Sequence, residues 1–66
     1  MNIQEIIARY CENKTKLYIK LFSEKETYDV FISDYGINFI AVKSNIQPQL
    51  RPMLINIENI EHMREV

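Results

Sequence analysis

The sequence predicts a small, mainly β domain in which an N-terminal α-helix precedes a five-stranded, strongly bent antiparallel sheet that closes into a barrel. Apolar residues recur at helical spacing over residues 2–13. Beyond them the apolar period changes to two, and clusters of turn residues divide the alternating runs. The 66 residues leave no room for a second domain.

The predicted helix covers residues 2–13. Asn2 is placed to cap its first turn, Glu5 follows at the capping-box position, and Asn13 is a suitable last residue. The apolar residues of this segment share one helical stripe, which we expect to face the core: Ile3, Ile6, Ile7, Tyr10 and Cys11.

Five runs of alternating apolar residues predict the strands, and they lie at residues 16–22, 27–33, 37–43, 53–58 and 60–65. Gly36, the only glycine, is expected to adopt a positive φ in a tight turn after Asp34 and Tyr35. Residues 44–52 contain both prolines and no periodicity, which predicts a stiff loop. A sharp turn is expected near Asn59.

Composition argues against several classes of function. Eight Lys and Arg against nine Asp and Glu give a net charge of −1, unlike proteins that grip nucleic acid by bulk electrostatics. No apolar run approaches the roughly 20 residues that span a bilayer, so we expect a soluble, cytoplasmic protein. Cys11 is interpreted as a packing residue and His62 as a surface residue. We therefore expect no enzymatic activity, metal, cofactor or small-molecule substrate.

Several strands carry apolar residues on both faces, which predicts self-association. The interface residues predicted from this pattern are Phe31, Ile40, Val42, Met53 and Ile55. Lys16 and Lys20 alternate with Tyr18 and Phe22 on one face of the first strand, as cations and stacking groups do in single-strand binders. Alternatively, the two aromatic side chains pack under the helix or against another subunit while the lysines extend into solvent.

The segment Asp34-Tyr35-Gly36-Ile37-Asn38-Phe39-Ile40-Ala41-Val42 resembles the first motif of the Sm-like family, which includes the bacterial Hfq branch. That motif has an Asp, two variable residues, an apolar residue, an Asn and then alternating apolar residues. The resemblance implies a homo-oligomeric ring of about five to seven protomers that binds single-stranded RNA in its pore. It also implies that Asn38 contacts a base and that Asp34 orients Asn38, with Tyr35 or Ile37 available for stacking. Without the resemblance, an Asx turn at Asp34 and an exposed strand end at Asn38 explain the same residues.

The sequence departs from the family at two positions. Tyr28 stands where the family has the glycine that bends its second strand, so we expect the barrel either to bend elsewhere or to be more open. Asn56-Ile57-Glu58 stands at the second motif and contains no basic residue. The predicted RNA-binding residues are Lys16, Lys20, Asp34, Tyr35 and Asn38. The alternative function is a non-enzymatic SH3-like protein-interaction module, such as a phage- or plasmid-encoded regulator of a host protein.

Overall fold

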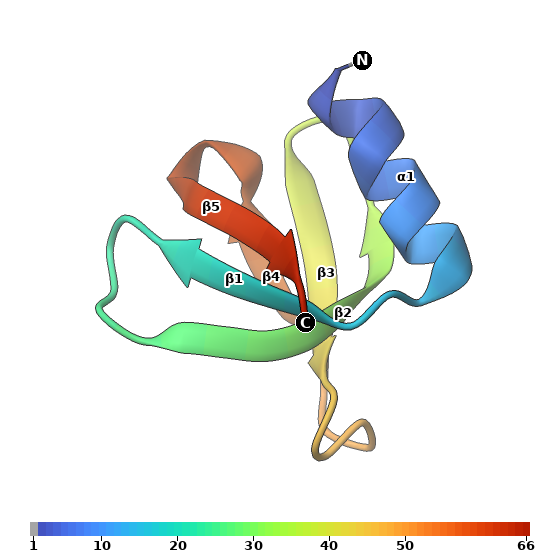
Figure 1. The fold of residues 1–66 in the computed structure, drawn as a ribbon, viewed down its shortest axis with the longest axis vertical. Coiled ribbons are helices and arrows are strands. Elements are labelled where there is room, and N and C mark those ends of the chain that lie inside the picture. The colour runs from blue at the N-terminus through green and yellow to red at the C-terminus, as the bar shows by residue number, and fades with distance from the viewer. Residues whose placement is uncertain (1) are drawn as a thin grey trace.

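A computed structural model describes residues 2–66 and confirms the predicted order of a helix followed by five antiparallel strands (Figure 1). The elements are α1 (Ile3–Asn13), β1 (Leu17–Leu21), β2 (Thr27–Tyr35), β3 (Phe39–Ser44), β4 (Met53–Asn56), the 3-10 helix η1 (Ile57–Asn59) and β5 (Ile60–Glu65). The predicted fourth strand thus ends early, and its last residues turn into η1. The described helix is neither long nor apolar enough to cross a membrane.

The predicted closure of the sheet into a barrel is wrong. The strand order is β4-β3-β2-β1-β5, so β4 and β5 are the two edges of an open sheet. The short β4 pairs only with β3, and β5 pairs only with β1. η1 carries the chain from one edge to the other without pairing them (Figure 1).

A bulge in β2 bends the sheet. Residues Thr27–Val30 pair with β1, whereas Val30–Tyr35 pair with β3, and the second register shifts between Ile32 and Asp34. Ser33 is the extra residue, and its hydroxyl donates to the carbonyl of Ala41 at 3.2 Å. Such a bulge bends a strand and increases its twist. The bend therefore lies at Ser33 and not at the position of Tyr28.

The helix begins and ends with specific backbone contacts. Asn2 Oδ1 accepts a hydrogen bond from the Glu5 amide at 2.9 Å, which confirms the predicted N-cap. After Asn13 the chain adopts the left-handed conformation at Lys14, with φ 49° and ψ 42°. Lys14 is the only residue other than glycine with a positive φ in the described chain.

Gly36 does not have the predicted positive φ. β2 continues through Tyr35, so Gly36 starts the turn, and its amide donates to the carbonyl of Phe39 at 2.9 Å. A Cβ at Gly36 would overlap the Phe39 ring. The Phe39 ring lies against the Gly36 backbone, so a larger residue at this position would require the ring to move, and no unusual dihedral angle is involved.

The core is aliphatic. Its buried side chains, all less than a tenth exposed, are Ile7, Leu17, Ile19, Leu21, Val30, Ile32, Ile40, Val42 and Ile55. Among residues 2–66, no polar or charged residue is buried. α1 contributes only Ile7 to this set, while Tyr10 and Cys11 pack at its margin. Ile3, at the start of the predicted stripe, is 47% exposed.

We expect Ile7→Ala to lower the free energy of unfolding by about 2–5 kcal/mol, because it removes the one fully buried side chain that attaches α1 to the sheet. Ile3→Ala removes the same atoms from a half-exposed site, and we expect it to cost less than about 1 kcal/mol. Urea unfolding followed by circular dichroism measures both. Equal losses for the two variants would contradict this account of how α1 is attached.

Candidate functional site

The turn between β2 and β3 lies against η1 and the start of α1, at the top of the view in Figure 1. The Ile57 amide donates to the carbonyl of Asn38 at 3.0 Å, and Gln4 Nε2 donates to the carbonyl of Ile37 at 2.9 Å. Asp34 Oδ1 accepts from the Tyr35 amide at 2.8 Å. The turn that contains Asn38 therefore adjoins the 56–59 segment.

This end of the molecule carries carboxylates and exposed apolar groups. Ile37 is 86% exposed and Tyr35 is 42% exposed, so both side chains offer surface for stacking. Asp34 and Glu58 are also exposed. Residues 56–59 contain no basic side chain, so they supply no cation to hold a phosphate beside Asn38.

The structure does not bring Lys20 to this turn. Lys20 Nζ lies 2.8 Å from Glu61 Oε2 and also donates to the carbonyl of Leu21 at 2.7 Å. Its cross-strand neighbours are Thr27 on β2 and His62 on β5. The predicted RNA-binding residues therefore form separate groups, and Lys20 belongs to an ion pair on the outer face of the sheet.

Lys16 lies in a different place, beside a cleft of about 220 Å³ on the outer face. The cleft is lined by Lys14, Lys16, Phe31, Asn45 and Pro48. It lies where the segment between α1 and β1 faces the loop after β3, which extends to the bottom of the view in Figure 1. Farther along the outer face, the Arg64 guanidinium lies over the Tyr18 ring at 4.9 Å from its centre.

Sequence reasoning identified Lys16 and Phe31 separately and missed the other residues that line this cleft. The alternation of Lys16 with Tyr18 was a signal for the outer face. The approach of Asn45 and Pro48 left no signal, because the loop that carries them has no periodicity.

Three residues of the predicted oligomer interface lie in the chain's own core. Ile40, Val42 and Ile55 are 0%, 1% and 3% exposed, so their side chains have no surface left for a second copy. Phe31 is half-buried at the cleft, and Met53 is 36% exposed on β4. The largest apolar exposure on β4 belongs to Leu54 (71%), which the sequence pattern did not single out.

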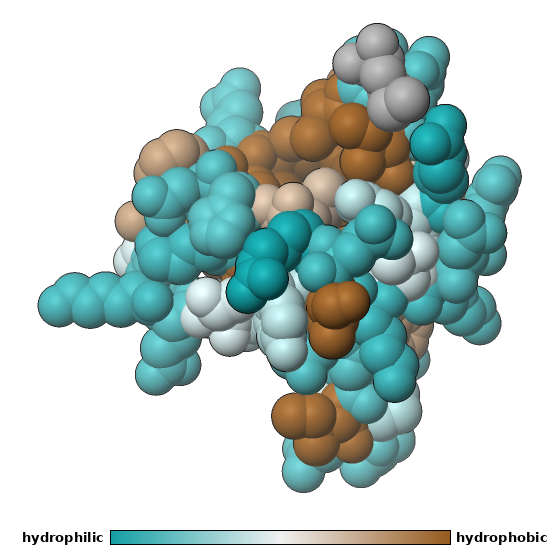
Figure 2. Space-filling model, in the orientation of Figure 1, coloured by the Kyte–Doolittle hydropathy of each residue, from teal (hydrophilic) through white to brown (hydrophobic). Residues whose placement is uncertain are grey.

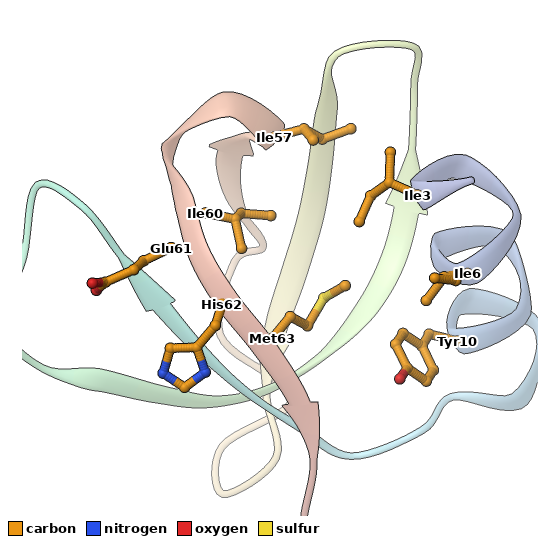
Figure 3. Close-up of a pocket in the computed structure, with 8 residues that line it drawn as sticks. All are labelled: Ile3, Ile6, Tyr10, Ile57, Ile60, Glu61, His62 and Met63. Atoms are coloured by element: carbon orange, nitrogen blue, oxygen red, sulfur yellow. The ribbon is translucent and has the colours of Figure 1, made fainter. Parts of the chain in front are cut away.

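An apolar groove of about 260 Å³ separates α1 from η1 and β5. Figure 2 shows apolar surface beside the start of α1, and Figure 3 shows the side chains at the groove. The apolar residues that line it are Ile3, Ile6, Tyr10, Ile57, Ile60 and Met63. Glu61 and His62 also border it, but their side chains point away from it (Figure 3).

Cys11 packs at the margin of the core. Burial raises the pKa of its thiol, and the carboxylates of Asp34 and Glu12 raise this pKa further. The thiol is therefore protonated at neutral pH, the form that is a poor nucleophile. Residues 2–66 contain no cluster of three or more His, Cys, Asp or Glu side chains that could hold a metal ion.

Comparison with protein-family models, with curated proteins and with solved structures gives no significant match.

The ion pair between Lys20 and Glu61 generates a testable pH dependence. The hydrogen bond from Lys20 lowers the pKa of the Glu61 carboxyl below its ordinary value. The pair therefore stabilises the fold above the pKa of glutamate in the unfolded chain, and this stabilisation is lost as pH falls through the lower folded pKa. We expect Lys20→Met to raise the pKa of Glu61, as measured by carbon-13 NMR titration, and Lys25→Met to leave it unchanged. An unchanged Glu61 pKa in Lys20→Met would mean that Lys20 does not pair with Glu61 in solution.

Proposed function

We propose that the protein is a non-enzymatic binding protein that assembles with copies of itself into a ring and binds single-stranded RNA. The observation that carries the assembly is the free edge of β4. An edge strand presents unpaired backbone N–H and C=O groups that can pair with a strand of another chain. The strand is short and follows Pro52, but its residues Met53, Leu54, Ile55 and Asn56 include no charged side chain that would oppose pairing.

The second free edge, β5, provides the complementary partner. β5 is longer than β4 and carries the charged residues Glu61, Arg64 and Glu65. Pairing of β4 with β5 of the next copy uses two different edges, and a head-to-tail contact of this kind gives a ring when its rotation closes. Pairing of β4 with β4 would instead give a two-fold dimer. The open sheet thus supports assembly by its two ends and not by the buried residues Ile40, Val42 and Ile55.

The support for RNA is the resemblance of residues 34–42 to the Sm-like motif, together with the position of the turn. Asn38 is exposed and its backbone contacts Ile57 in η1. Its amide can both donate to and accept from the edge of a base, and the nearby Tyr35 ring is accessible for stacking. In a ring, every copy would present this turn once.

We expect Leu54→Lys to convert the assembly into monomers, because it places a charge on the exposed side of the β4 edge. Light scattering coupled to size-exclusion chromatography measures the native mass. Ile46→Lys is the matched control, since Ile46 is 77% exposed on the loop outside the sheet, close to the 71% of Leu54. A Leu54→Lys protein with the mass of the parent would exclude the β4 edge as the contact. A parent protein that is monomeric and indifferent to RNA would favour the protein-interaction module.

We expect Asn38→Ala to weaken binding of short uridine-rich or adenine-rich RNA by about 1–3 kcal/mol without changing the native mass, because it removes one group that contacts a base. Fluorescence anisotropy with end-labelled octamers measures the affinity. Gln49→Ala, which truncates an exposed amide on the 45–52 loop, should bind as the parent does. Equal affinities for Asn38→Ala and the parent would remove Asn38 from the RNA site.

A further inference from the structure

The cleft on the outer face is built around Phe31, which lies between Lys16, just before β1, and Lys43 on β3. Leu17 of β1 and Val30 of β2 are cross-strand partners, and both are buried. Because the strands are antiparallel, Lys16, just before Leu17, lies opposite Phe31, just after Val30, and both are on the outer face. On the other side of Phe31, Lys43 is its partner in β3. The register of three neighbouring segments therefore produces the row Lys16, Phe31, Lys43.

Two more segments turn this row into a cleft. Lys14, held in the left-handed conformation after α1, adds a third ammonium group at one side. Asn45 and Pro48, from the stiff loop after β3, form the opposite wall. Asn45 is fixed in place, since its amide group donates to Asp29 Oδ1 at 2.6 Å and its backbone N–H donates to the carbonyl of Asp29 at 3.1 Å.

These groups match the chemistry of a nucleotide. An aromatic ring provides a surface on which a base stacks, and lysine ammonium groups bind phosphate. Because Asn45 Nδ2 is engaged by Asp29, the other arm of the amide, Oδ1, faces away from that carboxylate as a hydrogen-bond acceptor for an amino or imino group of a base. Asp29 lies two residues before Phe31 on β2, and its carboxylate accepts the hydrogen bond from Asn45 Nδ2.

We infer that this cleft binds one nucleotide unit, with the base against Phe31 and the phosphate beside Lys14 and Lys16. The inference rests on the proposed RNA binding for its choice of ligand, and it names the cations that the turn at Asn38 lacks. It does not require the ring, because all of the residues come from one chain. The same chemistry is offered by a free nucleotide and by a nucleotide within a single strand.

The volume of the cleft agrees with the binding of a single nucleotide. Its volume of about 220 Å³ is below the roughly 300 Å³ at which pockets for drug-sized ligands begin. The space is large enough for one base, while the sugar and phosphate remain at the mouth. Lys14 and Lys16 are exposed there, so their ammonium groups can reach a phosphate without being buried.

The test compares RNA affinities of cleft variants with those of matched variants elsewhere on the surface. Phe31→Leu keeps an apolar side chain but removes the stacking ring, and it should weaken octamer binding about tenfold. Lys16→Gln should weaken binding about fivefold at 0.1 M salt and reduce the slope of log affinity against log salt by about 0.7. Phe22→Leu and Lys25→Gln remove the same groups from exposed sites that do not line the cleft, and they should bind like the parent.

Saturation-transfer NMR with uridine 5′-monophosphate provides the second arm, with uridine and inorganic phosphate as partial probes. We expect transfer to the base protons of the nucleotide in the parent, less transfer with uridine, and loss of transfer in Phe31→Leu. Thermal unfolding checks that each variant is folded. If Phe31→Leu is destabilised, Lys16→Gln, which changes an exposed side chain, decides the result.

The outcomes of these experiments distinguish nucleotide binding in the cleft from the proposed RNA binding at the turn that contains Asn38. RNA binding that is lost in the cleft variants but not in their controls supports the inference, whatever Asn38→Ala does. RNA binding that responds only to Asn38→Ala overturns the inference and leaves the proposed function intact. Nucleotide binding that needs Phe31, in a protein that binds no RNA, supports the cleft as a site for free nucleotides and overturns RNA binding. No binding of either ligand overturns both.

Discussion

The fold depends on the pairing of β2 with two neighbours at once. Its first half is bonded to β1 and its second half to β3, and the bulge at Ser33 bends the strand within the second half. A straight strand would leave the two halves of the sheet in one plane, with their apolar faces open to water. The bend instead turns the inner faces toward one another, so that Leu17, Ile19 and Leu21 of β1 share one core with Ile40, Val42 and Ile55. A chain this short buries only about 60% of the surface that its unfolded form exposes, less than a larger domain does, so its stability depends on this convergence of the two halves on one core.

The sheet is open, and its two faces differ in composition. The inner face is aliphatic and covered by α1, whereas the outer face carries lysines, Tyr18, Phe31 and Arg64. The edges differ as well, since β4 is apolar and β5 is charged. Ring assembly would use the edges and leave the outer face exposed, so assembly and ligand binding would draw on separate parts of the surface.

Local patterns were sufficient to predict the helix with its Asn2 cap and the order of all five strands. They were insufficient wherever the orientation or the role of a residue depends on contacts with a second segment of the chain. Residues 39–42 are apolar on both faces, so alternation alone did not reveal that Ile40 and Val42 point inward, and they were assigned to an interface. Gly36 suggested a backbone with a positive φ, whereas the structure shows a negative φ and the ring of Phe39 packed against the Gly36 backbone. The row of Lys16, Phe31 and Lys43 depends on the register of three segments, which no single segment encodes.

The attachment of α1 has a consequence for how the molecule opens. Within the described chain, only Ile7 of the helix is fully buried, while the groove toward β5 already leaves Ile3 half-exposed. Detaching the helix would expose one large side chain and the margin of the core, whereas separating the strands would break the ladder of β2. Amide protons of α1 should therefore exchange with solvent through a local opening of low free energy, and those of β1, β2 and β3 through global unfolding. The domain would then behave as a stable sheet with a helical cover that lifts on its own.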